Sequence, residues 1–394
     1  MFLENTMLNL YNLHVTMIRG RKTDKKEHHK MDVIFSNLGN LEIKQAIMWI
    51  IGGVLIYLAI KKEMEPTLLL PMGFGAILIN LPESGAKAVI DHLFEIGIES
   101  NELMPLVLFI GIGAMIDFEP LLGNPKLMFF GAAAQFGIFF TLVLASVFGF
   151  ELTDAASIAI IGAADGPTSI FVAQTLNSNY TAAIMVAAYS YMALVPIVQP
   201  PIIKLCTTKK ERRIRMKYST NKVSKMTKIL FPIFVTVIVG LVAPDAVALI
   251  GFLMFGNLIR ECGVLNSLSD TAQNVLANLI TIFLGLTIAS RMTADEFLRG
   301  ETLLIMGLGL VAFIFDTFGG IMLAKFMNLF SKNKINTIIG AAGISAFTMS
   351  ARVVSKIAKE EDPQNYILMQ AIGVNVSGQI ASVIAGGLIL SLVR

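Results

Sequence analysis

An aspartate inside an apolar stretch, Asp165, is the residue best suited to chemistry in this sequence. It is the only charged residue in IAIIGAADGPTSIFV, residues 158–172. A carboxylate at membrane depth is costly and usually faces a cavity or a partner. Gly166 and Pro167 would interrupt a helix here and free backbone carbonyls, which could bind a small hard cation together with the Thr168 hydroxyl. The alternative is that Asp165 lies in a loop at the membrane interface and binds no ion.

A second polar segment runs from Asn336 to Arg352 and contains glycines, hydroxyls and an amide, but no acid. The last apolar segment adds Asn375 and Ser377. One carboxylate with neutral oxygens suits a reversibly bound monovalent cation, whereas several carboxylates would favour a divalent ion. For glycines such as Gly340, close helix packing is an equally good explanation.

Other polar residues in apolar stretches are weaker candidates. Asp316 and Lys325 lie nine residues apart, too far for a direct pair on a helix, and Asp316 is a second-rank candidate for the ion path. Tyr189 and Tyr191 either anchor the chain at the membrane interface or donate phenolic protons into a cavity. The sequence has no Walker A loop and no Rossmann fingerprint. We therefore expect energy to come from an ion gradient or from another subunit.

The composition assigns these residues to a membrane protein. Hydrophobic residues make up 55% of the 394 and charged residues 15%, against roughly 25% charged in an ordinary globular domain. The mean hydropathy of +0.71 agrees. A soluble fold, a disordered chain, a collagen and a nucleic-acid binder are excluded. Two cysteines, and four histidines without metal-ligand spacing, exclude a disulfide scaffold and a cysteine-rich metal site.

The apolar segments between residues 45 and 393 predict an all-α polytopic membrane protein with about ten or eleven transmembrane helices. A full span needs roughly 20 apolar residues. Four of the segments are shorter, so we also expect interrupted, tilted or half-spanning helices: 67–81, 103–116, 229–242 and 246–258.

The chain divides into four regions. Residues 1–44 form a polar, basic N-terminal extension whose weak apolar part precedes its basic run, the reverse of a signal peptide. Two membrane repeats, 45–203 and 229–394, flank the linker 204–228. This linker carries ten Lys or Arg residues and a single acid, Glu211. The positive-inside rule therefore predicts that it is cytoplasmic.

The two halves show weak self-similarity. The motif Ile-Gly-Ala-Ala begins at Ile161 and again at Ile339, 178 residues later. Gly113 and Gly285, in a second pair of similar segments, lie 172 residues apart. Similar offsets favour one duplication. Transporters built from inverted repeats place their sites at interrupted segments in matching positions, so we expect an inverted repeat with its site near these motifs.

Three long motifs resemble the β subunit of the sodium-translocating carboxybiotin decarboxylases. They are GAADGPTSIFVA (162–173), GNLIRECGVLNSLSDTAQN (256–274) and IGAAGISAFTMSARVVSKIAKEEDPQNYILMQAIGVNVSGQI (339–380). The resemblance runs from about residue 45 to the C-terminus. This family serves oxaloacetate, glutaconyl-CoA and methylmalonyl-CoA decarboxylase complexes.

The resemblance implies a translocase in a bacterial inner membrane. An α subunit with carboxyltransferase and biotin-carrier parts would load a carboxyl group onto its own biotin. This chain would then decarboxylate the carboxybiotin and move Na+ outward while a proton is consumed. Partners would also include a small membrane-anchored γ-type subunit, membrane lipid and further copies of this chain, as a trimer, but no nucleic acid. The partner α subunit would select the acid.

The resemblance also implies roles for individual residues. Asp165 would bind Na+ or a proton in alternation, and Arg352 would orient the carboxylate of carboxybiotin as a planar fork. The catalytic set would be Asp165, Tyr191, Ser345 and Arg352; the Na+ ligands Asp165, Asn336, Ser345 and Asn375; and the second-rank residues Gly340, Thr168, Ser377 and Asp316. One departure is Thr337 after Asn336, where we expect proline in relatives. The rival interpretation is a stand-alone secondary transporter, either a Na+/H+ antiporter or a Na+-coupled organic-anion symporter.

Overall fold

The computed structural model describes residues 40–393 apart from positions 64, 101, 217–221 and 347. The described residues form helices and loops with no β-strand, so the predicted all-α fold is confirmed. Most of the expected N-terminal extension, residues 1–39, lies outside the described part of the chain.

Helices fill both halves of the chain. The first half contains α3 (Ile43–Lys62), α4 (Pro66–Ile79), α5 (Gly85–Phe94), η1 (Glu95–Glu99), α6 (Leu103–Met115), α7 (Glu119–Gly123), η2 (Pro125–Leu127), α8 (Met128–Ala134), α9 (Phe136–Val147), α10 (Leu152–Ala159), η3 (Ile160–Ala163), α11 (Gly166–Thr175) and α12 (Thr181–Cys206). The linker contains α13 (Lys209–Arg212). The second half contains α14 (Lys225–Val242), which starts at the end of the linker, η4 (Pro244–Ala246), α15 (Val247–Cys262), α16 (Asn266–Asp270), η5 (Thr271–Leu276), α17 (Ala277–Ala289), α18 (Ala294–Phe297), α19 (Gly300–Phe330), η6 (Thr337–Gly343), α20 (Met349–Glu361) and α21 (Leu368–Val393).

Seven helices in the described part of the chain are long and apolar enough to cross a membrane, if η2, α8 and α9 (Pro125–Val147) count as one and α16, η5 and α17 (Asn266–Ala289) as another. An eighth span results if α5–η1 and α6, which meet at a bend of 66°, are taken together. The remaining apolar segments that we expected form shorter helices, such as α4 and α10–η3. By length and composition, seven or eight spans are thus found among the described residues, and the shorter helices match the interrupted or half-spanning segments also expected from the sequence.

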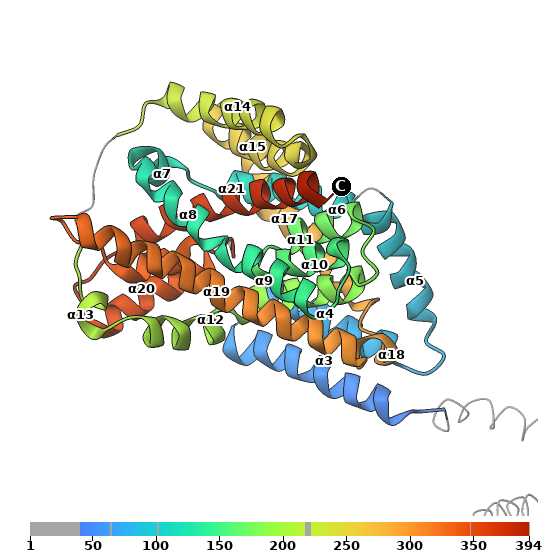
Figure 1. The fold of residues 1–394 in the computed structure, drawn as a ribbon. Helices are drawn as coiled ribbons and strands as arrows, with labels where there is room; N and C mark the ends of the chain where they lie inside the picture. The colour runs from blue at the N-terminus through green and yellow to red at the C-terminus, as the bar shows by residue number, and fades with distance from the viewer. Residues whose placement is uncertain (1–39, 64, 101, 217–221, 347, 394) are drawn as a thin grey trace, which may run out of the picture.

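The long helix α19 forms the centre of the bundle and packs against α9, α12, η3 and η6. Figure 1 shows α13 and α20 together at one end of the bundle, and α5 and α18 at the other. The same view places α3 and α14 on opposite sides. Both of these outer helices bury few of their residues, as expected of helices whose apolar sides contact lipid.

Two glycines bring the backbones of α19 and η6 into contact. A Cβ atom on Gly340 would lie 2.0 Å from the carbonyl oxygen of Gly320, and a Cβ on Gly320 would lie equally close to that of Gly340. Only glycine fits at either position. Gly340 therefore has a packing role in this structure.

Each half contains a helix that breaks in the same order, a 3-10 turn followed by an α-helix. In the first half η3 ends at Ala163, and the next residue, Ala164, has a positive φ of 51°. Asp165 is extended, and α11 then starts with Gly166 and Pro167, a position where proline is tolerated. In the second half η6 ends at Gly343, and α20 begins six residues later.

Candidate functional site

Asp165 lies in the break between η3 and α11, and its side chain is buried. Its Oδ2 accepts hydrogen bonds from the Thr168 hydroxyl at 2.7 Å and from the Ser382 hydroxyl of α21 at 3.3 Å. Carboxylate and hydroxyl oxygens are the ligands that hard cations prefer. The break therefore gathers a charge and two neutral oxygens from two helices.

The two broken helices cross beside this carboxylate. Ser345 donates to the carbonyl of Ala163 from both its backbone nitrogen, at 3.2 Å, and its hydroxyl, at 2.7 Å. Asn375 holds the second break in shape. Its Nδ2 donates to three carbonyls of residues 342–346 at 2.7 to 3.2 Å, and its Oδ1 accepts from the Thr348 nitrogen at 2.9 Å. Ser345 thus binds the backbone two residues before the aspartate, while Asn375 binds the backbone around Ser345.

A cavity of about 430 Å³ lies beside the crossing. Arg352 at the start of α20 and Glu65 before α4 line it, together with Tyr189 of α12. The Tyr189 hydroxyl is buried and has no hydrogen-bond partner among the described residues. Its ring packs on Gly166, where a Cβ would lie 2.4 Å from Cζ. Tyr189 therefore connects the wall of the cavity to the residue that follows Asp165.

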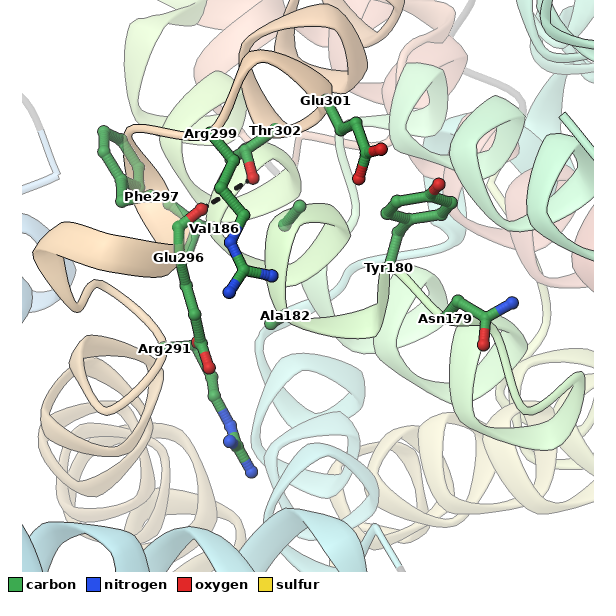
Figure 2. Close-up of a pocket in the computed structure, with 11 residues that line it drawn as sticks. Asn179, Tyr180, Ala182, Val186, Arg291, Glu296, Phe297, Arg299, Glu301 and Thr302 are labelled. Carbon is green, nitrogen blue, oxygen red and sulfur yellow. Dashed lines mark hydrogen bonds between the residues drawn. The ribbon is translucent and has the colours of Figure 1, made fainter. Parts of the chain in front are cut away.

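Polar cavities also occur at the end of the bundle where α5 and α18 lie. One of about 350 Å³ is lined by Tyr180, Arg291, Arg299 and Glu301, with the Arg299 guanidinium pointing into it (Figure 2). A second, of about 370 Å³, shares Arg291 and is lined by Gln174 in the last turn of α11. The helix that starts beside the buried aspartate therefore ends at this second cavity.

The structure places two of the predicted residues away from the carboxylate. The Tyr191 hydroxyl donates to the carbonyl of Met306 in α19. Asn336 lies before η6, where its amide nitrogen donates to the carbonyls of Arg212 and Ile214 in the linker, at 2.8 and 2.9 Å. Neither side chain directs a described hydrogen bond to the aspartate.

Two second-rank residues also have partners of their own. The Ser377 hydroxyl donates to the carbonyl of Leu127 at 3.0 Å. Asp316 is buried, and its Oδ1 accepts from the nitrogen of Ile138 at 3.2 Å. Its Oδ2 faces Gly162 of η3, where a Cβ would lie 2.7 Å away. Asp316 thus approaches the first broken helix at η3, three residues before Asp165.

Two residues in this arrangement were absent from the predicted site. Ser382 lies seven residues after Asn375, two turns along α21 and on the same face. This spacing could have predicted that Ser382 faces the same region as Asn375. Tyr189 was considered beside Tyr191, but two residues along a helix point to different faces. Only the packing of α12 shows which tyrosine faces the cavity.

A buried carboxylate with hydroxyl partners at a helix break, within a bundle of long apolar helices, is the arrangement typical of an ion-translocating membrane protein. A family model described as "Na+-transporting oxaloacetate decarboxylase beta subunit" matches residues 44–393. The methylmalonyl-CoA decarboxylase subunit beta of Propionigenium modestum is 47% identical over 391 residues, which cover 93% of this chain and 98% of the relative. The oxaloacetate decarboxylase beta chain of Klebsiella pneumoniae is 43% identical over 429 residues, covering 92% of this chain and 99% of the relative. The chain belongs to the family of Na+-transporting decarboxylase β subunits.

The family confirms the resemblance found in the sequence. The chain is the membrane subunit of a decarboxylase sodium pump, and the match over nearly its whole length supports this interpretation over the stand-alone transporter. The family name implies Na+ as the transported ion and implies partner subunits.

Proposed function

We propose that this chain decarboxylates carboxybiotin carried by a partner subunit, and that the reaction moves Na+ outward while a proton is consumed. The observation that carries the proposal is the connection between one cavity and one carboxylate. Arg352 lines the cavity, and Tyr189, in the same cavity, packs on the glycine next to Asp165. Binding in the cavity is therefore positioned to act on the ion site.

The cavity suits a small ligand with a carboxylate. Its volume of about 430 Å³ is within the range of roughly 300–1,000 Å³ typical of small-molecule sites. A guanidinium such as that of Arg352 binds a carboxylate through two parallel hydrogen bonds. When the C–N bond of carboxybiotin breaks, its electrons remain on the ureido nitrogen, CO2 leaves, and the nitrogen takes a proton. Tyr189 lines the cavity, and we assign this donation to its hydroxyl, which has no hydrogen-bond partner among the described residues.

The ion site consists of Asp165 with Thr168, Ser345 and Ser382 around it. At this depth one positive charge compensates one carboxylate, so Na+ and a proton compete for Asp165. Proton entry would displace Na+. The break would adopt two arrangements, each of which would expose the Asp165 carboxylate to a different end of the bundle. Asn375 supports this exchange by holding the second break.

The linker 204–228 lies on the cytoplasmic side in this proposal, because it concentrates positive charge. Na+ then enters from the Arg352 cavity and leaves through the cavities at the α5 and α18 end, in a bacterial inner membrane. The partners are a carboxyltransferase and biotin-carrier α subunit and a small γ-type subunit, around a trimer of this chain. The α subunit decides which acid is used, methylmalonyl-CoA and oxaloacetate being the substrates in the names of the relatives.

Replacing Asp165 with Asn tests the proposal. The variant keeps the size of the side chain and its ability to accept from Thr168, but it cannot offer a charge. We expect the purified complex in proteoliposomes to lose Na+-stimulated decarboxylation and uptake of radioactive Na+ together.

A suitable control is Asp295→Asn, an exposed carboxylate that pairs with Lys44. It should leave both activities unchanged. If the Asp165 variant decarboxylates with the wild-type dependence on Na+, the assignment of the ion site is wrong.

A further inference from the structure

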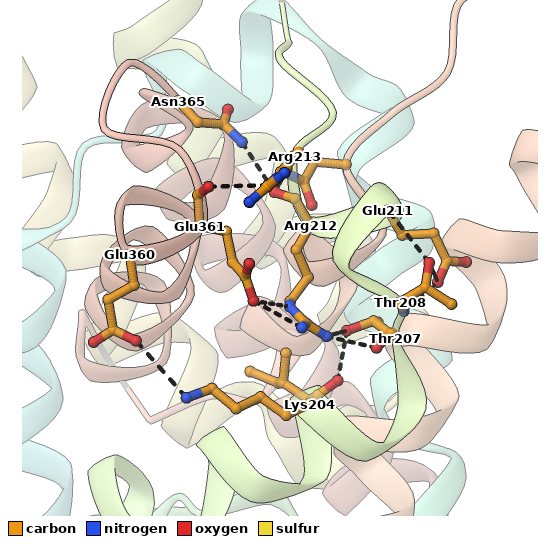
Figure 3. Close-up of polar contacts among 11 residues, drawn as sticks. Lys204, Thr207, Thr208, Glu211, Arg212, Arg213, Glu360, Glu361 and Asn365 are labelled. Carbon is orange, nitrogen blue, oxygen red and sulfur yellow. Dashed lines mark hydrogen bonds and ion pairs between the residues drawn. The ribbon is translucent and has the colours of Figure 1, made fainter.

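The first part of the linker, residues 207–215, is bound tightly to the end of α20 (Figure 3). The buried Arg212 contacts the Glu361 carboxylate through Nε at 2.8 Å and through its terminal nitrogen at 2.7 Å. Its other terminal nitrogen donates to the carbonyl of Thr207 at 2.5 Å. Arg215 adds a two-point contact with Asp362, at 2.6 and 3.0 Å. We call residues 207–215 the linker clamp.

Two buried asparagines bind the same two carbonyls of the linker clamp. Asn336 donates to the carbonyls of Arg212 and Ile214 at 2.8 and 2.9 Å. Asn365, after α20, donates to the same pair at 3.0 and 3.3 Å. The Oδ1 of Asn336 also accepts from the backbone nitrogen of Ile338 at 3.2 Å. Both hydrogens and the oxygen of the Asn336 amide are therefore in use.

These contacts fix both ends of the second broken helix. Asn336 stands immediately before η6, and the acidic pair stands at the end of α20 and just after it. Between these ends lie Ser345, which contacts the first broken helix, and Arg352, which lines the cavity. A shift of the linker clamp therefore moves both groups.

We infer that the linker clamp positions the second broken helix for turnover, and that Asn336 is a positioning residue rather than a Na+ ligand. The loss of a buried hydrogen bond is destabilising. Asn336 cannot turn its amide toward an ion without losing both hydrogen bonds to the linker carbonyls and the one that its Oδ1 accepts from the Ile338 nitrogen, although those carbonyls would still accept from Asn365. Asn365 performs the same task from the opposite end of the helix. The inference rests on the proposed ion site at Asp165 for its functional part.

The test compares Asn336→Asp with Asn365→Asp in the whole complex. Each variant replaces two donating hydrogens with a carboxylate oxygen that repels the carbonyls. We expect both to lower turnover about tenfold or more through the loss of two hydrogen bonds, with the Na+ concentration for half-maximal rate unchanged. Trypsin should also cut the linker clamp faster in both variants, because it contains Lys209, Lys210 and three arginines. Asn333→Asp, an exposed substitution in the same loop, is the matched control.

Different results would overturn the inference. A rise of tenfold or more in the half-saturating Na+ concentration for Asn336→Asp alone would make that residue an ion ligand. Faster cleavage of the linker with normal turnover in both variants would show that the clamp has no effect on the site. If Asn336→Asp fails to fold, Asn365→Asp still answers the question, and the cleavage assay needs no activity. Failure of the Asp165 proposal is visible separately in its own variant.

Discussion

Replacing Tyr189 with Phe should separate stability from activity. The substitution removes one hydroxyl that is buried and has no partner among the described residues, and it leaves the ring that packs on Gly166. A buried polar group without a partner costs about 1–3 kcal/mol. The variant should therefore be more stable than the wild type, by up to about 1–3 kcal/mol.

Activity should move in the opposite direction. If the hydroxyl donates to the charged ligand bound at Arg352, its loss removes a hydrogen bond worth about 1.5–3 kcal/mol. This corresponds to a fall of about 10- to 100-fold in kcat/KM for carboxybiotin. The Na+ concentration for half-maximal rate should stay close to the wild-type value, because the carboxylate and its hydroxyl partners are untouched.

The assay measures decarboxylation by the purified complex at several concentrations of the carboxylated carrier, with the Tm in detergent recorded for the same preparation. Tyr57→Phe, on the exposed face of α3, is the matched control and should change neither quantity. A Tyr189→Phe variant with unchanged kcat/KM would refute the role of the hydroxyl. A variant with a clearly lower Tm would show that the hydroxyl has a structural partner.

Two further predictions concern packing and pH. Gly340→Ala should lower stability by about 1–3 kcal/mol, because its Cβ would meet the Gly320 backbone. The control, Gly307→Ala on the open side of α19, should be tolerated. Equal Tm values for the two variants would contradict the close contact between Gly340 and Gly320. The hydrogen bond from Arg212 holds the pKa of Glu361 below its usual 4.5. The stabilisation from this group is therefore complete above pH 4.5 and is lost as the pH falls through the lowered pKa. Thermal unfolding between pH 6 and 3 should show this loss of stability in the wild type but not in Glu361→Gln. If the Tm of the two proteins falls in parallel with pH, the titration of Glu361 does not contribute to stability.

The sequence predicted the position of Asp165 well because two independent signals coincide there. A charge in an apolar stretch is expensive wherever it lies, and Gly166 with Pro167 interrupts a helix through backbone geometry alone. The all-α fold followed in the same way from composition. Both conclusions depend on local chemistry, which a single chain displays directly.

The partners of polar side chains were less predictable, because they depend on segments far apart in the sequence. In the sequence, Asn336 looks like a side chain that is free to bind an ion. Its partners are the carbonyls of Arg212 and Ile214, which lie 124 and 122 residues earlier in the chain. The choice between Tyr189 and Tyr191 depends on the rotation of α12. The bounds of the spans are less predictable than the fold class, because hydropathy reports how apolar a segment is and does not report where its helix ends.

The linker clamp has a consequence for the order of events during biosynthesis. Arg212 is translated 149 residues before Glu361 and 153 residues before Asn365. At about 5–20 residues per second, the arginine waits on the order of ten seconds for its partners to be made. During that interval the arginine lacks the partners that it has in the finished fold, and under the proposed orientation its positive charge would favour retention of the segment on the cytoplasmic side. The same side chains would thus act first as an orientation signal for the nascent chain, and later as the contact that joins the end of the first half to the finished second half.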